Sequence, residues 1–281
     1  MISGTQEEFN GVLLLTVAER GQEHRSYIKK QYYKLPLQVL PPYDPDGDGT
    51  LCVYLLNPSG GILQNDRLLI DVEAEENSRI CITTPSSTKL YKMKEGENAR
   101  QHIHIRAAKG SIIEYVPDEN VPYRDTDYIQ TTEFDITEDT TLFAWDILSA
   151  GRIAREEIFS FRQYISKTCI YIDGKPVMID STRVRPGEMP VRSKIGMEDF
   201  TFTAVIYIYA KQADENLLQK LRERVPLYET HRIGYTRPDN KVLVIRLLAK
   251  QIWQLKEEMF DIWNLARNHI LGKSAVQIRK Y

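Results

Sequence analysis

Cysteine is scarce in this sequence, and its spacing excludes the common cysteine-based scaffolds. The 281 residues contain only Cys52, Cys81 and Cys169. An odd number of widely separated cysteines disfavours both a disulfide framework and a CxxC metal site. Each cysteine lies within an apolar, β-branched run, so we expect three buried strand thiols in the reducing environment of the cytoplasm.

The sequence also lacks an excess of charge of one sign and a long hydrophobic segment. Its 37 basic and 39 acidic side chains give a net charge of −2, which disfavours a nucleic-acid partner because phosphate binding needs a basic surface. No apolar stretch approaches the about 20 residues of a transmembrane helix, and no basic segment followed by an apolar one indicates a secretory signal. We therefore expect no membrane partner and a cytoplasmic location.

Motifs of several enzyme classes are missing as well. Without a G-x-x-x-x-G-K-[ST] sequence, the chain has no P-loop of its own for nucleotide phosphates. The G-x-S-x-G, H-E-x-x-H and G-x-G-x-x-G motifs are also absent. The sequence therefore gives no sign of these nucleophilic, zinc-dependent or dinucleotide-dependent activities.

Short β-branched and aromatic runs, separated by turn residues, dominate the first 210 residues. The clearest runs span 11–17, 51–56, 79–84, 111–116, 141–145, 168–172 and 200–209. This spacing predicts many strands in stacked or closed sheets. Asp173-Gly174, between two apolar runs, is the clearest hairpin turn.

The last quarter of the chain has helical periodicity instead. Leu217, Leu218 and Leu221 share one face of a helix predicted over 214–224, and a longer helical pattern begins near Leu248 and stops at Gly272. We therefore predict one mainly β domain over 1–281. Its β-rich part is 1–210, and its C-terminal part, 211–281, contains the two helices.

Three carboxylates follow apolar runs, which is unusual for charged residues. Glu114, Asp146 and Asp180 each come directly after two or three large apolar side chains. Burial of an ionised acid costs several kcal/mol unless the acid is paired or hydrated. These acids therefore indicate a polar interior channel or an acid/base site. Alternatively, each acid could lie at a strand end that faces solvent, or could pair with an arginine. Spacing alone does not decide between these structural roles and a functional one.

Two histidines lie at alternating positions of one predicted strand. In the sequence 102–105, His102 and His104 share one face, and Ile103 and Ile105 share the other. The histidines could hold nickel, copper or zinc with a third ligand from a neighbouring strand. We favour the simpler interpretation, in which the isoleucines face the core and the histidines lie on a solvated face.

Several ordered sequence blocks match the motifs of one protein family. Residues 55–68 are similar to the block N-P-x-G-G-[IL]-x-x-x-D-x-L, residues 83–91 to T-T-x-x-x-[ST]-K-x-Y, and residues 114–117 to E-[WY]-L-P. Further matches lie at 144–146, 151–152, 157–159, 263 and 271–274. In these blocks the chain resembles the UreD family of urease accessory proteins, also called UreH. Asn65 and Glu156 stand where the family usually has glycine.

The resemblance implies a scaffold of β-helical, stacked-sheet architecture that is not an enzyme. Such a metallochaperone scaffold would bind UreF-type and UreG-type accessory proteins and apo-urease, and would help to deliver Ni²⁺ to the urease active site. GTP would be bound only by the UreG-like partner. The resemblance gives structural roles to ten motif residues: Gly60, Gly61, Arg67, Thr83, Thr84, Lys89, Pro117, Gly151, Arg152 and Glu157.

We hypothesise that oxygen-bearing side chains line a wet interior path for nickel. The candidates are Asp66, Thr88, Glu114, Asp146 and Asp180. Carboxylates would lower the electrostatic cost of moving Ni²⁺ through protein and still release it, whereas imidazole or thiolate ligands would trap it. His102 and His104 would then be peripheral, or at most the place where nickel enters.

Two alternatives to this path remain open at the level of sequence. One is a carbohydrate-active β-helix enzyme that uses Glu114 and another acid as its catalytic pair. The other is a docking module that only holds the partners against urease.

Overall fold

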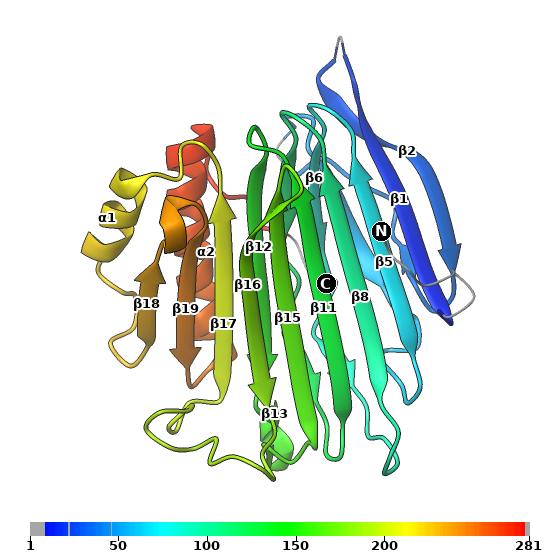
Figure 1. The fold of residues 1–281 in the computed structure, drawn as a ribbon, viewed down its shortest axis with the longest axis vertical. Coiled ribbons are helices and arrows are strands. Elements are labelled where there is room, and N and C mark those ends of the chain that lie inside the picture. Colours follow the sequence, from blue (N-terminus) through cyan, green and yellow to red (C-terminus); the bar gives the residue numbers. More distant parts are fainter. Residues whose placement is uncertain (1–8, 22, 46, 279–281) are drawn as a thin grey trace.

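Two facing β-sheets form the body of the protein in the computed structural model, which describes residues 9–21, 23–45 and 47–278 (Figure 1). Within these residues, one sheet has seven strands in the order β16-β15-β11-β8-β5-β1-β2. Their bounds are β1 Gly11–Arg20, β2 Arg25–Lys34, β5 Arg67–Ala74, β8 Ala99–Ala107, β11 Asp127–Ile136, β15 Gln163–Ile172 and β16 Lys175–Val184.

The second sheet has ten strands within the same described residues. Eight of them follow the order β18-β19-β17-β12-β9-β6-β4-β3, and β7 and β10 join beside β12. Their bounds are β3 Gln38–Val39, β4 Leu51–Leu56, β6 Arg79–Thr83, β7 Thr88–Leu90, β9 Ile112–Tyr115, β10 Asn120–Pro122, β12 Thr141–Ser149, β17 Phe202–Tyr209, β18 Arg232–Thr236 and β19 Leu243–Ala249. A small ribbon of β13 (Gly151–Arg152) and β14 (Glu157–Ile158) follows β12.

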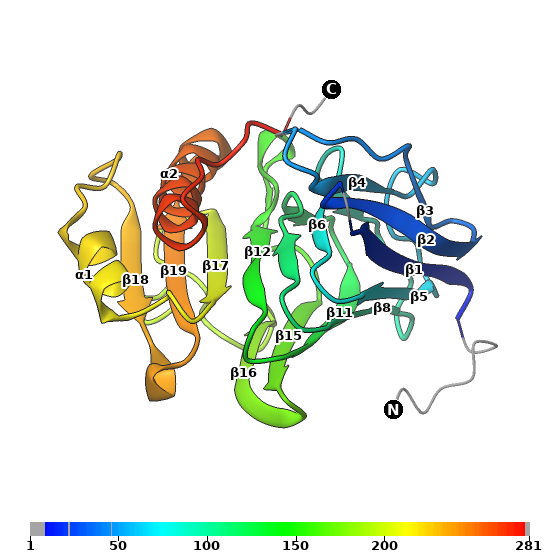
Figure 2. The same cartoon turned by 90° about the horizontal axis from the view of Figure 1, so that it is seen from above.

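The chain winds between the two sheets as a β-solenoid of about four turns. The successive turns are formed by β4 and β5, β6 and β8, β9 and β11, and β12 and β15, and neighbouring turns pair in parallel within each sheet. Figure 2 shows the two layers edge-on. The predicted mainly β, β-helical stacked-sheet architecture is confirmed.

Side-chain alternation places the core between the two sheets. In β11, every second residue from Tyr128 to Ile136 is buried, and the residues between them are partly exposed. Leucine, isoleucine and aromatic side chains from the inner faces of both sheets form one continuous cluster. Burial of apolar surface contributes about 25 cal/mol per Å², so this cluster is the main source of stability. Two of the inward positions of β11 are nevertheless polar, Gln130 and Thr132.

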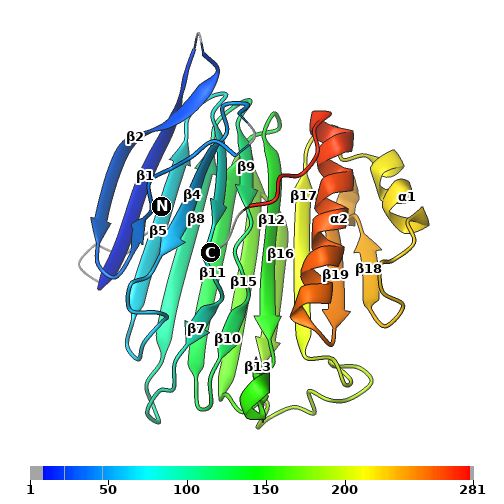
Figure 3. The ribbon, with the colours of Figure 1, turned by 180° about the vertical axis from the view of Figure 1, so that it is seen from behind.

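The two predicted helices both follow residue 210. The first, α1 (Glu215–Glu223), begins after Asp214, whose side chain accepts a hydrogen bond of 3.0 Å from the Leu217 backbone N–H. The second, α2 (Ile252–Leu271), lies on the outer face of β17 and β19 (Figure 3). It begins four residues later than the helical pattern near Leu248, because Leu248 belongs to β19. No helix in the described part of the chain is long and apolar enough to cross a membrane.

A C-terminal strap, residues 273–278, returns from α2 to the solenoid (Figure 3). Gly272 ends the helix with a left-handed φ of 66°. The Lys273 ammonium lies 2.6 Å from the Asp48 carboxylate, and Ile278 packs against Cys52 and Cys81 on the outer face of the ten-stranded sheet. The strap therefore joins the helical part of the chain to the first solenoid turns.

Two residues that replace glycine of the family pattern keep a glycine-like backbone. Asn65 has φ 65° and Glu156 has φ 59°, both in the left-handed region. The same region is used at the predicted hairpin turn, where Asp173 and Gly174 have φ 49° and 72° and join the antiparallel strands β15 and β16. The turn geometry is therefore retained although the side chains differ.

Gly151→Ala is expected to destabilise the fold by about 2 kcal/mol or more. Gly151 has φ 134°, and an added Cβ would lie 2.1 Å from the carbonyl oxygen of Glu157, across the β13–β14 ribbon. Urea unfolding of the wild type and the variant measures the loss. Gly187→Ala is the matched control, because a Cβ there meets no atom within 4 Å. Equal stability of both variants would show that the ribbon has room for a side chain.

Candidate functional site: a polar cavity between the sheets

A small cavity of about 60 Å³ lies between the two sheets and has a partly polar lining. The volume is enough for a few water molecules when polar partners are present. The polar side chains that line it include Asn57, Thr84, Thr88, Gln101, Asp118, Asn120, Gln130 and Asp146. These residues come from both sheets and from the segments that connect β6, β7 and β10, so the site exists only in the folded solenoid.

Asp146, in β12, is one of two carboxylates in the polar lining, and Asp118 is the other. The side-chain amide of Asn120 donates to it at 3.3 Å, and the Tyr164 hydroxyl lies 3.3 Å from its other oxygen. Burial raises the pKa of Asp146 above the usual range, and these hydrogen bonds oppose the rise only in part. The site therefore holds an acid whose ionised form lacks a cationic partner among the hydrogen bonds and ion pairs of the described residues.

A chain of hydrogen bonds continues from the cavity along the inner face of the seven-stranded sheet. The Tyr128 hydroxyl contacts Gln101 at 3.2 Å and Gln130 at 3.1 Å, and Gln130 reaches Thr132 at 3.4 Å. Tyr128 and Tyr164 are fully buried, and burial raises the pKa of both phenols. Buried polar groups are normally hydrogen-bonded, so these contacts satisfy a polar layer inside an otherwise apolar core.

Asp180, in β16, lies at the side of the solenoid next to β17. It accepts a 2.8 Å hydrogen bond from the Tyr207 hydroxyl and forms a 2.6 Å ion pair with Arg246 of β19. The arginine side chain is half exposed, whereas the Asp180 side chain is 11% exposed. Asp180 is therefore paired, and it does not line the cavity.

Asp66 and Thr88 occupy different places relative to the cavity. Thr88 begins β7 and lines the cavity together with Asp146. Asp66 precedes β5, where its carboxylate accepts a 2.8 Å hydrogen bond from the Leu63 backbone N–H and closes a turn. Burial raises the pKa of Asp66, and its charge also contributes to the raised pKa of Tyr128.

Glu114 points away from the cavity, to the opposite face of its sheet. Its carboxylate accepts a 2.8 Å hydrogen bond from the Trp263 indole and lies 3.2 Å from the Arg267 guanidinium, both on α2. Glu114 and Arg267 are each 3% exposed at the side chain. The pair joins α2 to the solenoid core, so the structure places Glu114 apart from the other four path candidates.

His102 and His104 lie on the outer face of the seven-stranded sheet, and Ile103 and Ile105 lie in the core. His104 is 2.7 Å from Asp135, and His102 is 3.4 Å from Glu133. Burial lowers the pKa of His102. No three or more His, Cys, Asp or Glu side chains in the described residues are placed to hold a metal ion together.

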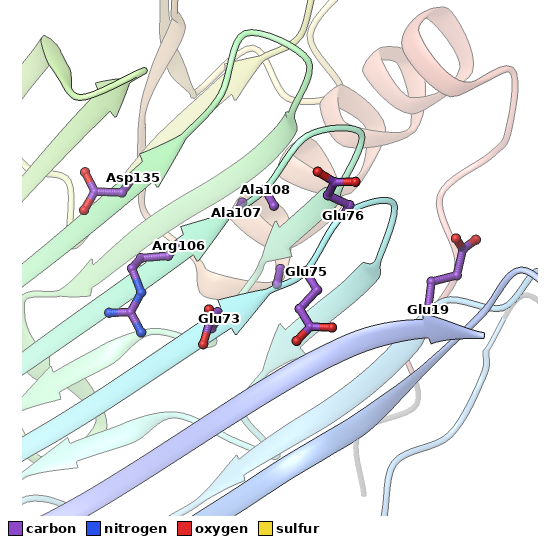
Figure 4. Close-up of a pocket in the computed structure, with 9 residues that line it drawn as sticks. Glu19, Glu73, Glu75, Glu76, Arg106, Ala107, Ala108 and Asp135 are labelled. Carbon is purple, nitrogen blue, oxygen red and sulfur yellow. The ribbon is translucent and has the colours of Figure 1, made fainter. Parts of the chain in front are cut away.

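An acidic groove of about 590 Å³ lies at one end of this outer face (Figure 4). Its charged lining consists of Glu19, Glu73, Glu75, Glu76, Asp135 and Arg106. Glu75 is paired with Lys29 at 2.6 Å, and Asp135 contacts His104. The groove is separated from the interior cavity by the seven-stranded sheet.

Comparison with known sequences decides the family. A sequence model described as UreD urease accessory protein matches residues 10–280. The chain belongs to the UreD family. It is 28% identical to the urease accessory protein UreD of Bacillus sp. (strain TB-90) over 96% of this chain and 98% of the relative. It is 30% identical to the urease accessory protein UreD 2 of Brucella anthropi over 87% and 88% of the two chains.

Several residues of the UreD blocks hold the loops around the cavity. The Thr83 hydroxyl donates to the Val116 carbonyl at 2.7 Å, and the Thr84 hydroxyl accepts from the Asp118 backbone N–H at 2.9 Å. The Pro117 carbonyl accepts a 2.8 Å hydrogen bond from the Trp145 indole. Thr84 and Pro117 also line the cavity. These motif residues therefore determine the shape of the cavity wall.

The remaining motif residues make close backbone or ion-pair contacts. Arg67 donates to the carbonyl oxygens of Asp66 and Asn98 at 2.9 and 2.8 Å. Arg152 and Glu157 form a two-point ion pair at 2.8 and 2.6 Å, which lowers the pKa of Glu157. Gly60 has φ 75°, and Gly61 lies so close to the Lys89 carbonyl that an added Cβ would be 2.3 Å from its oxygen. The Lys89 residue is exposed in β7.

Sequence reasoning missed five polar lining residues, Asn57, Gln101, Asp118, Asn120 and Gln130. Gln130 had a usable signal, because it occupies an inward position of a strand whose alternate residues are Tyr128, Phe134 and Ile136. The other four lie next to turns or in polar surroundings, where an inward position leaves no pattern in the sequence.

Arg267→Ala is expected to lower the free energy of unfolding by about 3–5 kcal/mol, because it leaves the Glu114 charge buried without its cation. Adding Glu114→Gln should recover part of the loss, since the amide can still accept from Trp263. Urea unfolding of the single and double variants measures the coupling. Arg222→Ala is the control, with a half-exposed ion pair at 3.8 Å and an expected change below about 1 kcal/mol.

Asp146→Asn is expected to stabilise the protein at neutral pH, and the gain should shrink toward about pH 4. The pKa of Asp146 is raised in the folded state, so its protonated form favours folding. The stabilisation by protonated Asp146 is complete only below the pKa of this residue in the unfolded state. It is lost as the pH rises through the pKa of Asp146 in the folded state, whereas asparagine does not titrate. Unfolding of both proteins across this range is the measurement. A gain that grows as the pH falls would contradict the burial of this acid.

Proposed function

We propose that this UreD-family protein is a non-enzymatic scaffold for urease maturation in the cytoplasm. It binds apo-urease and UreF-type and UreG-type accessory proteins, and it passes Ni²⁺ along its polar interior to the urease active site. GTP hydrolysis belongs to the UreG-like partner, since the chain has no P-loop sequence. The names of its relatives as urease accessory proteins support the role in urease assembly.

One observation carries the interior path, namely the half-buried Asp146 carboxylate beside a cavity with room for a few water molecules. A buried carboxylate is destabilising unless a cation or water meets it, so its presence in an apolar solenoid needs a reason outside stability. At an effective dielectric constant near 20, a carboxylate about 4 Å from a divalent cation contributes several kcal/mol of attraction. Neutral Thr88, Asn120 and Gln130 oxygens around it complete a lining that is oxygen-rich and only weakly binding.

Asp66 and Asp180 lie outside the cavity lining. Asp66 closes the turn before β5, and Asp180 accepts a hydrogen bond from Tyr207 beside the half-exposed Arg246. In the proposal they form the approaches to Asp146. Glu114 takes a structural role instead, because it points away from the cavity and its arginine partner is buried, whereas the Arg246 partner of Asp180 is half exposed.

A surface groove of about 460 Å³ lies beside α2 and shares the Pro117-Asp118 segment with the cavity. The Lys256 ammonium is 2.8 Å from both Asp118 and Glu119 at this point. A cation that leaves the cavity here competes with Lys256 for the same carboxylates. Lys256 is therefore the proposed gate between the interior and the α2 side.

The carbohydrate-active alternative is not favoured by these contacts. Glu114 and Asp146 point to opposite faces of one sheet, so they cannot flank a single glycosidic bond. Glu114 is also paired with an arginine and buried, which removes it as an acid or base. The activation experiment described next distinguishes a protein that only docks the partners from one that also conducts nickel.

Asp146→Asn is expected to reduce urease activation about tenfold or more, equivalent to a barrier rise of about 1.4 kcal/mol. The variant removes the central charge and keeps the shape of the side chain. Urease activity and nickel content are measured after coexpression with the partners, together with copurification of the complex. Asp118→Asn should act in the same direction.

Asp173→Asn is the matched control, because Asp173 is exposed in a turn where asparagine is equally suited. Full activation by both Asp146→Asn and Asp118→Asn, with complex formation intact, would leave only the docking role. Loss of copurification in Asp146→Asn would instead place this residue in partner binding.

A further inference from the structure

Two thiols lie side by side on the outer face of the ten-stranded sheet. Cys52 and Cys81 are in-register partners on the parallel strands β4 and β6, and they are 0% and 4% exposed. Interaction with Cys52 is the largest cause of the raised pKa of Cys81, followed by burial. All three cysteines lie in the described part of the chain and none forms a disulfide, and Cys169 belongs to the other sheet.

The spacing of neighbouring strands suits an ion between the sulfurs better than a bond between them. Strands in a sheet are about 4.8 Å apart, and in-register Cβ atoms keep about that separation. A disulfide needs Cβ atoms about 3.5–4.5 Å apart, so it would require the strands to approach. Two metal–sulfur bonds of about 2.3 Å span nearly the strand spacing without such a movement.

Among the described residues, the surroundings of the pair offer no third sulfur or nitrogen ligand. Val116, Tyr43, Trp145 and Ile278 pack around the sulfurs. Glu114 is the next residue in the same row, but its oxygens contact Arg267 and Trp263. Because the described residues contain no set of three metal-ligating side chains, a cation here would be held by the two sulfurs alone.

We propose that Cys52 and Cys81 form a two-coordinate site for a thiophilic monovalent d¹⁰ cation of the Cu(I) class. Soft thiolates favour such ions, and two ligands are enough for them. Ni²⁺ requires at least four ligands in a square or octahedral arrangement, so this site discriminates against it. The pair is buried among mostly apolar side chains, which favours a compact site without water ligands.

Binding breaks two S–H bonds and forms two S–Cu bonds, and two protons leave to the solvent without a change in oxidation state. The bound site carries one negative charge. The nearby Arg267 guanidinium lowers the pKa of Cys81 and would offset this charge, whereas Glu114 acts in the opposite direction. Tyr43, which contacts Cys52, has a pKa raised by burial and stays protonated.

The site lies on the opposite face of the sheet from the oxygen-lined cavity. Ile80 and Ile82, which flank Cys81 in β6, belong to the core between the sheets. The strand alternation therefore keeps sulfur ligands out of the interior and places them under the C-terminal strap, whose Ile278 covers them. The sulfur site does not depend on whether nickel passes through the interior.

The test is an anaerobic titration of the reduced full-length protein with Cu(I) supplied as its bicinchoninate complex, which changes absorbance when it loses the ion. One equivalent of Cu(I) is expected to transfer to each chain. Cys52→Ala and Cys81→Ala should each weaken binding about 100-fold or more, because one thiol loses the advantage of the pair. Cys169→Ala, the matched control, should bind as the wild type does.

Two further measurements do not depend on the folding of variants. Wild-type affinity should rise by up to about 100-fold per pH unit while both thiols are protonated, because two protons are released. X-ray absorption of the Cu(I)-loaded wild type should show two sulfur ligands and no nitrogen. Nitrogen ligands, a second bound ion of equal affinity, or unchanged binding in a folded Cys52→Ala/Cys81→Ala variant would overturn the proposal.

Discussion

The desolvation of one carboxyl group, Asp146, is the constraint on which the interior of this protein depends. Its side chain is enclosed by two sheets whose other inward residues are mostly leucine, isoleucine and aromatic. Hydrogen bonds from Asn120 and Tyr164, together with contacts to Ser166 and the Ile147 backbone, compensate this charge only in part. A sequence under selection for stability alone would place an apolar side chain there, because well-packed hydrophobic residues often replace buried charges without loss.

The two faces of the ten-stranded sheet carry different chemistry, and the two-residue period of the strand separates them. The inner face presents oxygen atoms around a small hydrated space. The outer face carries Cys52, Cys81 and Glu114 in one row, under α2 and the C-terminal strap. A shift of register by one residue in β9 or β6 would exchange these groups, so parallel pairing with neighbouring turns is what keeps hard and soft ligands apart.

Much of the fold was predictable from local pattern. The run at 51–56 coincides with β4, Asp173-Gly174 forms the hairpin between β15 and β16, and α1 begins after Asp214. The start of α2 was less predictable, because Leu247 and Leu248 fit both the end of a strand and the first turn of a helix. β15 begins five residues before its apolar run, since pairing with β11 continues through polar residues such as Ser166 and Lys167.

The sequence by itself determined that this chain forms stacked strands, ends in two helices and resembles the UreD family. Those properties are encoded in short-range periodicity, turn residues and ordered motifs. Only the tertiary structure decided which buried acids share a space. Glu114 and Asp146 look alike in sequence, since each follows an apolar run, yet one meets Arg267 on α2 and the other faces the cavity. The difference depends on which layer covers each side of the sheet, and that is set by contacts between residues far apart in the chain.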